Sequence, residues 1–399
     1  MSYDVAAVRQ LFPALSEGAA HFDGPGGSQT AAPVAAAVAA ALTAAVANRG
    51  TVTRAERRAD RIVRGARQAA ADLLGAEPNG VVFGRSMTAL TYDLSRALAK
   101  QWRSGEEVVV TRLDHDANVR PWVQAAAAAG VAVRWADIDP ETGELPTRAV
   151  TELLSARTRL VAVTAASNLL GTRPAVAAIV RAARAVGAVT YLDGVHLTPH
   201  AAVDVADLGA DFYACSPYKF CGPHLGILAA SPMLLQSLHP DKLLPSPEDV
   251  PDRFEFGTLP YELLAGVSAA VDVLAGLVPA SGSRRARLLV SMRAVEEHEA
   301  CLFTRLIDGL RSLRGVGLIG RPARRTPTVL FRVDGHTPDQ VAAHLATSGV
   351  NAPAGSFYAI EASRRLGLGD AGAVRAGLAP YSNDDDVDRL LAGVATLPR

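Results

Sequence analysis

The sequence contains little cysteine and has no excess of charge of either sign. Its 399 residues include three cysteines, Cys215, Cys221 and Cys301, and no two of them have C-x-x-C spacing. This gives no disulfide framework and no cysteine metal motif, and it is typical of a reducing, cytoplasmic setting. Lysine plus arginine and aspartate plus glutamate number 40 each. The overall charge therefore gives no reason to expect a nucleic acid or a membrane surface as a partner.

Long apolar runs and the common nucleotide-binding motifs are also missing. The alanine-rich stretch 125–129 is far too short to span a membrane, and residues 1–15 lack the apolar core of a signal peptide. No G-x-G-x-x-G opens a first strand–helix turn, which speaks against a nicotinamide cofactor. Neither G-x-x-x-x-G-K-[ST] nor G-x-S-x-G occurs.

Strand-like and helix-like patterns alternate from about residue 81 to residue 230. We predict strands at 81–83, 107–111, 131–135, 160–165, 189–192, 211–215 and 226–230, with helices between most of them. This alternation predicts an α/β domain in which a mostly parallel, seven-stranded sheet lies between helices. From about residue 283 the pattern changes to a smaller α+β unit, with helices at 284–311 and 384–394 and a strand at 328–333.

Polar residues follow the ends of these predicted strands. In a parallel sheet, ligands bind beyond the carboxyl ends of the strands. Any one of these residues could be a helix cap or a plain loop residue, but together on one edge of one sheet they predict a binding site. They are Thr88, His115, Asn168, Asp193, His196, Ser216 and Lys219.

Lys219 has the most unusual surroundings of these residues. It follows a buried strand and lies between Tyr218 and Phe220. Lysine is rarely buried unless it is paired or used. Burial lowers the pKa of the amine, and the neutral amine is then available as a nucleophile or Schiff-base former. The plain alternative is a lysine at a strand end that extends to water.

Pyridoxal phosphate is a cofactor that would use such a set of residues. It needs a lysine for a Schiff base, an acid for the pyridine nitrogen, donors for its phosphate and a group on its ring face. Lys219 and Asp193 suit the first two needs. The remaining candidates are Ser86, Thr88 and Ser216 for the phosphate, and His115 or His196 for the ring face.

A zinc site is the competing interpretation of two of the histidines. His196 and His200 are four residues apart and could share a helix face. Pro199 lies between them, however, and no cysteine or carboxylate completes a ligand set, so we expect no metal.

Around these residues the chain resembles the class V aminotransferase family of fold-type I pyridoxal-phosphate enzymes. The resemblance is to the branch with SufS-type cysteine desulfurases and isopenicillin epimerase-like proteins, and it runs from Phe22 to Asp388. Its most specific segments are Leu113–Asn118, Ser167–Thr172, Asp193–His196 and Ser216–Lys219. It implies a large cofactor-binding domain at 18–282, a small C-terminal domain at 283–399, and an N-terminal segment at 1–17 that packs with the small domain.

The resemblance also implies a role for each matching position. Lys219 would form the internal aldimine, Asp193 would pair with the pyridine nitrogen and His115 would stack on the ring. Asn168 would lie near the ring hydroxyl, and His196 takes the place of the usual glutamine at the cofactor. The phosphate would be held by Ser86, Met87 through its backbone, Thr88, Ser216 and Tyr218, of which the last replaces the usual histidine.

Further matches concern the substrate and a second subunit. Thr258 would reach the phosphate of the neighbouring subunit, which implies a homodimer with shared sites. Arg375 resembles the arginine that the family uses for the substrate carboxylate, and a bidentate guanidinium is the natural partner of that group. We expect Gln29 and Arg49 to be further substrate-binding residues, and Tyr358 and His196 to help set the choice of substrate.

The segment Asn351–Tyr358 departs most from the family. Desulfurases carry their persulfide-forming cysteine here, and this sequence has none. We therefore predict a cytoplasmic, homodimeric enzyme that acts on an amino acid or related amine through an external aldimine, most of all as an aminotransferase. A desulfurase-like C–S lyase or epimerase without a persulfide cysteine is one alternative. A protein that binds pyridoxal phosphate without turnover is another.

Overall fold

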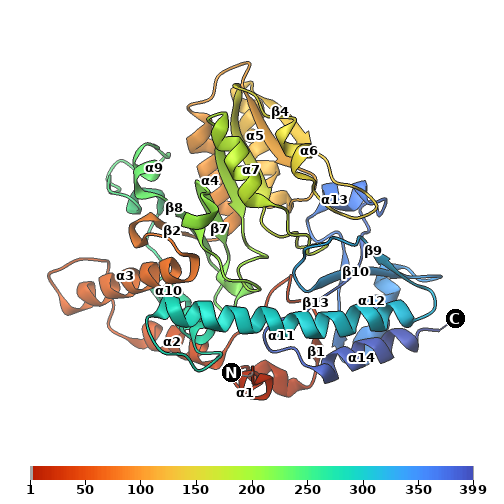
Figure 1. The fold of residues 1–399 in the computed structure, drawn as a ribbon. Coiled ribbons are helices and arrows are strands. Elements are labelled where there is room, and N and C mark those ends of the chain that lie inside the picture. The colour runs from red at the N-terminus through yellow and green to blue at the C-terminus, as the bar shows by residue number, and fades with distance from the viewer. Residues whose placement is uncertain (1–2, 399) are drawn as a thin grey trace.

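The computed structural model describes residues 3–398, and a seven-stranded sheet forms the centre of the larger part (Figure 1). The strand order is β2-β8-β7-β6-β5-β3-β4. Neighbours from β4 to β7 are parallel, and β8 runs antiparallel to both β7 and β2. This confirms the predicted α/β fold. The strands are β2 (Val81–Gly84), β3 (Glu107–Thr111), β4 (Ala132–Ala136), β5 (Thr158–Thr164), β6 (Val189–Asp193), β7 (Phe212–Cys215) and β8 (Gly226–Ala230).

Apart from the edge strand β4, which is partly exposed, the apolar strands are buried on both faces, as their continuous apolar runs predict. Successive side chains point to opposite faces of a sheet. Val108 and Val110 accordingly join one cluster with Trp122 of α5 (Arg120–Ala129) and residues of α4 (Met87–Ala99). Val109 joins the other cluster with Ile179 of α7 (Val176–Ala185). Helices on both faces thus leave the strand ends as the accessible edge of the sheet.

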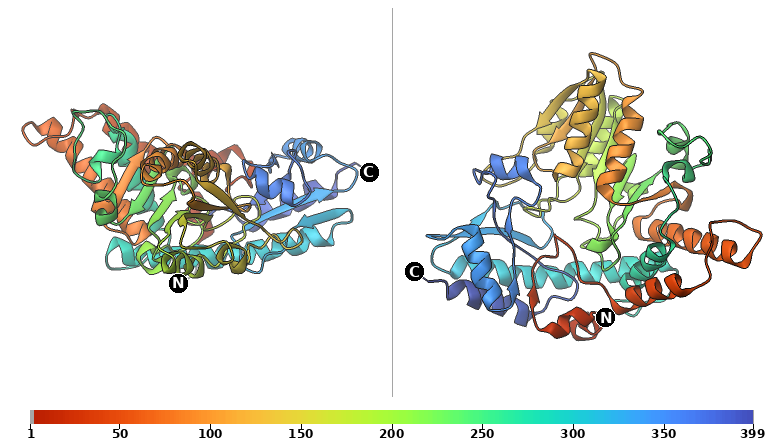
Figure 2. Two further views of the ribbon diagram at one scale, coloured as in Figure 1. Left: turned by 90° about the horizontal axis from the view of Figure 1, so that it is seen from above. Right: turned by 180° about the vertical axis from the view of Figure 1, so that it is seen from behind.

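The C-terminal part has its own sheet and core. Four strands follow the order β12-β13-β10-β9, and each pair is antiparallel. In both views of Figure 2 this blue part lies to one side of the larger part. The long helix α11 (Arg284–Ser312) extends from the larger part to the C-terminal part (Figure 1). The other elements are β9 (Val316–Ile319), β10 (Thr328–Val333), β12 (Ala354–Gly355), β13 (Ala373–Gly377), α12 (Pro338–Thr347), α13 (Ile360–Arg365) and α14 (Asp384–Ala395).

The N-terminal residues contact this C-terminal part. Tyr3 stacks on His298, with ring centroids 4.6 Å apart, and Arg9 pairs with Asp386 at 2.7 Å. The short strand β1 (Ala20–His21) pairs in parallel with β11 (Val350–Asn351). The chain therefore crosses to the C-terminal part before it enters the larger one. The domain boundaries after residues 17 and 282 stay predictions.

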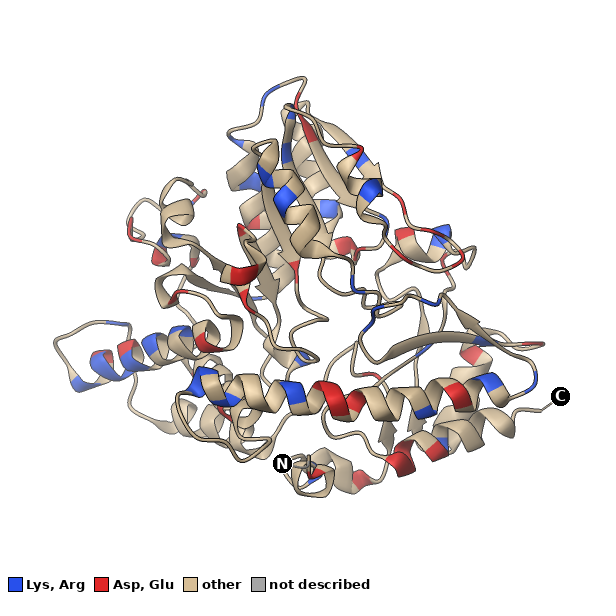
Figure 3. Cartoon of the chain, viewed as in Figure 1, with Lys and Arg blue, Asp and Glu red and all other residues tan. Residues whose placement is uncertain are grey.

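The remaining helices lie mostly around the larger part. They are α1 (Val5–Arg9), α2 (Ala32–Thr43), α3 (Arg54–Leu74), α6 (Thr147–Thr151), α8 (Val205–Leu208), α9 (Pro232–Gln236) and α10 (Tyr261–Ala275). Between residues 3 and 398, no helix is both long enough and apolar enough to cross a membrane. Helix α3 carries bands of positive and negative charge along its length (Figure 3).

A buried ion pair fixes strand β2, which leads into the site. Arg67 of α3 donates to both carboxylate oxygens of Glu255, at 3.0 and 2.9 Å, and to the carbonyl of Val81 at 2.7 Å. The same carboxylate accepts from the N–H of Phe83 at 2.9 Å. A buried pair of this kind is strongly destabilising to break, because one charge is left without a partner.

We expect Arg67→Met to lower the free energy of unfolding by about 3–5 kcal/mol, because the Glu255 carboxylate loses its partner. Urea unfolding followed by circular dichroism measures this loss. Burial raises the pKa of Glu255 to about 7. The measurement should therefore be made in mildly alkaline buffer, where this carboxyl group is charged. The control is Arg64→Met on the same helix, whose exposed pair with Asp60 should contribute under about 1 kcal/mol. Equal losses for both variants would contradict the role of Arg67.

Candidate active site

A cavity of about 640 Å³ lies beyond the carboxyl ends of the central strands. Of the fourteen residues that the sequence predicts for the site, eleven line it: Ser86, Met87, Thr88, His115, Asn168, Asp193, His196, Ser216, Tyr218, Lys219 and Arg375. The strand-end argument predicted seven of these residues, and the family resemblance added others, including Arg375, up to about 290 positions away in the chain.

Lys219 is the buried lysine of this cavity. Of the three lysines in the sequence, Lys100 and Lys242 pair with the exposed carboxylates of Asp241 and Glu248, whereas Lys219 is 9% exposed. Its amine donates to the carbonyl of Pro25. Burial, and next the charge of Arg375, lower the pKa of Lys219 from 10.5 to about 7. A large fraction of the amine is therefore uncharged near neutral pH.

Asp193 ends strand β6, beside the strand that leads to Lys219. In the parallel pairing of β6 with β7 it lies opposite Ala214. The carboxylate is 3% exposed and accepts from the N–H of Val195 at 2.9 Å. Burial raises the pKa of Asp193 to about 6, against the attraction of Lys219. A buried carboxylate at this edge suits a cationic ring nitrogen.

The N-terminus of α4 also lines the cavity, through Ser86, Met87 and Thr88. Ser86 caps this helix, and its hydroxyl accepts from the N–H of Ala89 at 3.1 Å. The first N–H groups of a helix have no partner within it and attract an anion such as a phosphate. Strand β8 passes so close beneath that a Cβ at Gly226 would clash with the backbone of Ser86 and Met87. Glycine at 226 therefore allows the close approach that fixes this turn.

His115 is held by the loop that follows β3. Its Nδ1 accepts from the N–H of Ala117 at 3.0 Å, so the neutral ring carries its proton on Nε2. Burial, and next the charge of Lys219, lower the pKa of His115 to about 4. Beneath it, the Asn118 amide donates to the buried carboxylate of Asp114 at 2.7 Å. This loop presents a neutral imidazole ring to the cavity.

His196 reaches toward the C-terminal part. Its Nε2 lies 3.0 Å from the hydroxyls of both Thr326 and Thr328, and its ring packs edge-on against His200 at 5.0 Å. His200 in turn contacts Glu299 at 2.9 Å. Over residues 3–398 there is no group of three or more histidine, cysteine, aspartate and glutamate side chains that could hold a metal ion.

Three predicted residues lie outside the cavity of this chain. Thr258 is on an exposed loop beside Gly257. Arg49 pairs with Asp60 and Asp252, and the side-chain amide of Gln29 lies 3.4 Å from the ring of His21. Their roles at the site, including that of Thr258 toward a second subunit, stay predictions.

The cavity also has walls that the strand-end argument did not find. Asp116 and Arg120 form a pair at 2.9 Å, and their i,i+4 spacing is a recognisable signal. Phe357 and Tyr358 both have left-handed backbones, with φ of 52° and 59°. Their carbonyls accept from the Asn168 amide at 2.9 Å and from the Asp116 N–H at 2.7 Å. No periodic pattern marks such an irregular loop.

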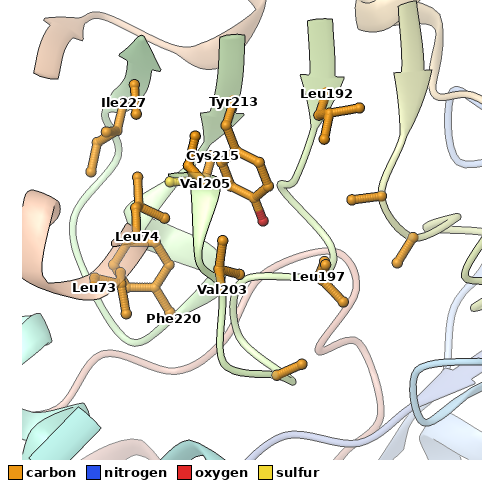
Figure 4. Close-up of a cluster of buried hydrophobic side chains, with 14 of the residues drawn as sticks. Leu73, Leu74, Leu192, Leu197, Val203, Val205, Tyr213, Cys215, Phe220 and Ile227 are labelled. Carbon is orange, nitrogen blue, oxygen red and sulfur yellow. The ribbon is translucent and has the colours of Figure 1, made fainter. Parts of the chain in front are cut away.

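None of the cysteines lines the cavity. Cys215 lies in the hydrophobic cluster of the larger part, near Tyr213 and Phe220 (Figure 4). Burial raises the pKa of both Cys215 and Cys221 to about 12, and Cys301 is exposed on α11. The segment around Phe357 therefore brings no thiol to this site.

The fold and the residues of the site together define a pyridoxal-phosphate enzyme. The lysine at the end of one strand, the carboxylate at the end of its neighbour and the anion-binding helix start fit the amine, ring nitrogen and phosphate needs of that cofactor. The chain belongs to the class V aminotransferase family, since the profile described as "Aminotransferase class-V" matches residues 20–390.

Individual relatives cover the whole chain. An uncharacterized protein of Mycobacterium tuberculosis is 38% identical over 400 residues and is matched over 100% of both chains. An aminotransferase-like protein of Gibberella zeae is 31% identical, over 98% of each. The crystal structure of the cysteine desulfurase CsdA from Escherichia coli has a TM-score of 0.87 at 25% identity and covers 99% of this chain and 98% of its own.

We expect the rate at which Lys219 captures pyridoxal phosphate to rise with pH through about 7, because the amine reacts only after it loses its proton. An unperturbed lysine would show this rise near 10.5. Near-visible absorption after mixing the cofactor-free chain with cofactor, at a series of pH values, gives the profile. Lys100→Ala is the control and should leave the profile unchanged. A rate that keeps increasing toward the ordinary lysine value would contradict the perturbed pKa.

Proposed function

We propose that this enzyme is an aminotransferase that acts on an amino acid or related amine. The observation that carries the proposal is the composition of one cavity wall. Lys219, Asp193 and Arg375 line it together, whereas no cysteine does. A lysine that moves protons is sufficient for transamination, but sulfur transfer in the way of the resembling desulfurases needs a thiol beside the substrate.

Each side chain of the cavity suits a different part of the cofactor. Pyridoxal phosphate supplies the electron-accepting ring. The Asp193 carboxylate would stabilise a proton on the ring nitrogen, and the N–H groups at the start of α4 would hold the phosphate together with the hydroxyls of Ser86, Thr88 and Ser216. The neutral imidazole of His115 would face the cofactor ring.

Lys219 is the proton carrier. With a pKa of about 7, its Nζ can take a proton from the substrate's α-carbon and deliver it again near neutral pH. Arg375 binds the substrate carboxylate and so orients the α-carbon toward Nζ. Asn168 and His196 complete the polar wall, and the Phe357 and Tyr358 side chains limit the access of water.

A C–S lyase or epimerase is the second candidate. It is favoured by the likeness to the cysteine desulfurase CsdA over 99% of the chain. The same residues would then serve a reaction in which a different bond of the substrate breaks. The sulfur that a C–S lyase releases would find no acceptor cysteine in the Asn351–Tyr358 segment, so no persulfide could form there.

We also propose a cytoplasmic homodimer with no nucleic-acid partner. Leu243, Leu244 and Phe256 are exposed by 71%, 97% and 45%, and they belong to the sequence segment 243–258 that includes Thr258. Large apolar side chains left exposed in this way favour an interface between proteins. Sedimentation equilibrium should give twice the mass of one chain, and Leu244→Asp should shift it toward the single chain. A monomeric wild-type protein would contradict this proposal.

We expect the purified protein to show the near-visible absorption of lysine-bound cofactor and to lose it on addition of a suitable L-amino acid, with recovery after a keto acid. Lys219→Ala should show no such band and no turnover, a loss of several orders of magnitude, whereas Lys100→Ala should behave as wild type. A band that persists while the substrate is cleaved or racemised would support the lyase or epimerase candidate instead.

A further inference from the structure

The guanidinium of Arg375 has partners from its own chain on several sides. Its Nη2 donates to Asp23 at 2.6 Å, and its Nη1 donates to the main-chain carbonyl of Asn168 at 3.0 Å. The ring of Phe357 lies 3.6 Å from its central carbon. Arg375 is only 1% exposed. Its Nε is buried with no hydrogen-bond partner, so a substrate carboxylate that forms a bidentate pair with the two outer nitrogens must replace one of these partners.

Asp23 is the partner that a carboxylate can best replace. Its side chain is 45% exposed toward the cavity that it lines, whereas that of Arg375 is 2% exposed. The Asn168 carbonyl is main chain, and the Asn168 amide also holds the carbonyl of Phe357 at 2.9 Å. Asp23 by contrast presents the same chemical group as the incoming ligand.

The loop that carries Asp23 is shaped to keep its carboxylate in this place. The N–H groups of Gly26 and Gly27 both donate to the Asp23 carbonyl, at 2.8 and 2.9 Å. A Cβ at Gly26 would clash with the Asp23 carboxylate itself. The next carbonyl of this loop, that of Pro25, accepts from Lys219. One short loop thus contacts both Lys219 and Arg375.

The Asp23 carboxylate balances the charge of the buried Arg375 guanidinium. A buried guanidinium without a carboxylate is strongly unfavourable, so some carboxylate must face Arg375 at all times. In the free chain that carboxylate belongs to Asp23. An incoming carboxylate keeps the balance while it sets Asp23 free to turn toward the open side of the cavity, where water can solvate it.

We propose that Asp23 is a specificity-determining residue, an internal occupant of Arg375 that a substrate carboxylate must displace. It weakens the binding of simple carboxylates, and it reserves Arg375 for amino acids whose other groups add enough binding to overcome the exchange. This inference rests on the proposed function in one respect, that Arg375 is the carboxylate-binding residue.

The test measures how tightly acetate binds the full-length chain, with and without pyridoxal phosphate. A ligand of the folded state stabilises it by RT ln(1 + [L]/Kd), so the melting temperature measured over a series of ligand concentrations gives the dissociation constant. Asp23→Asn should bind acetate about tenfold more tightly than wild type, because the anion no longer competes with a charged partner. Acetamide, which has the same shape and no charge, should bind neither protein.

Two further variants separate displacement from a general change of charge. Gly26→Ala pushes the Asp23 carboxylate away without altering any charge, and it should also tighten acetate binding; it serves in place of Asp23→Asn where that variant does not fold. Asp241→Asn removes a carboxylate that pairs with Lys100 outside the cavity, and it should leave acetate binding unchanged.

Equal acetate affinities in wild type, Asp23→Asn and Gly26→Ala would overturn the proposal. An equally large gain in Asp241→Asn would also overturn it, since the effect would then be one of overall charge. The measurement requires no turnover. A chain that fails to transaminate can therefore still show the exchange at Arg375, and a chain that transaminates can still lack it.

Discussion

The burial of one lysine is the constraint on which the site depends. Lys219 can be buried because the Pro25 carbonyl accepts from its amine and because Asp23 and Asp193 attract its charge. Arg375 and the loss of hydration act in the opposite direction, and their balance leaves the pKa of Lys219 near 7. These groups come from a glycine-rich loop, two adjacent strand ends and the C-terminal sheet. The reactivity of the lysine is therefore a property of the folded chain.

The segment at Phe357 and Tyr358 forms an irregular wall of the cavity and contains no cysteine. Left-handed backbones at bulky residues cost on the order of 1–3 kcal/mol each and persist only where the surroundings hold them. Here hydrogen bonds from Asn168 and Asp116 hold both carbonyls. The segment covers Arg375 with an aromatic ring in the region where the resembling desulfurases carry a cysteine, so it changes both the chemistry and the access of the cavity.

The two parts of the molecule are joined through the site. Arg375 lies on β13 of the C-terminal sheet and donates to Asn168 and Asp23, while His196 of the larger part lies against Thr326 and Thr328. A ligand that bound at Arg375 would therefore act on contacts between the parts. Such contacts allow binding energy at the carboxylate to position the reacting carbon near Lys219, some distance away.

The sequence by itself determined the sheet, because buried parallel strands must be apolar throughout and their ends must meet at one edge. That argument also found Lys219, Asp193 and the other residues at the strand ends. It could not find the Asp23–Arg375 pair, which joins residues 352 positions apart, or the short strand β9, whose four half-buried residues include a glycine. Tertiary structure alone decided these, because hydrogen bonds between distant segments and the irregular backbone of Phe357 leave no periodic trace in the chain.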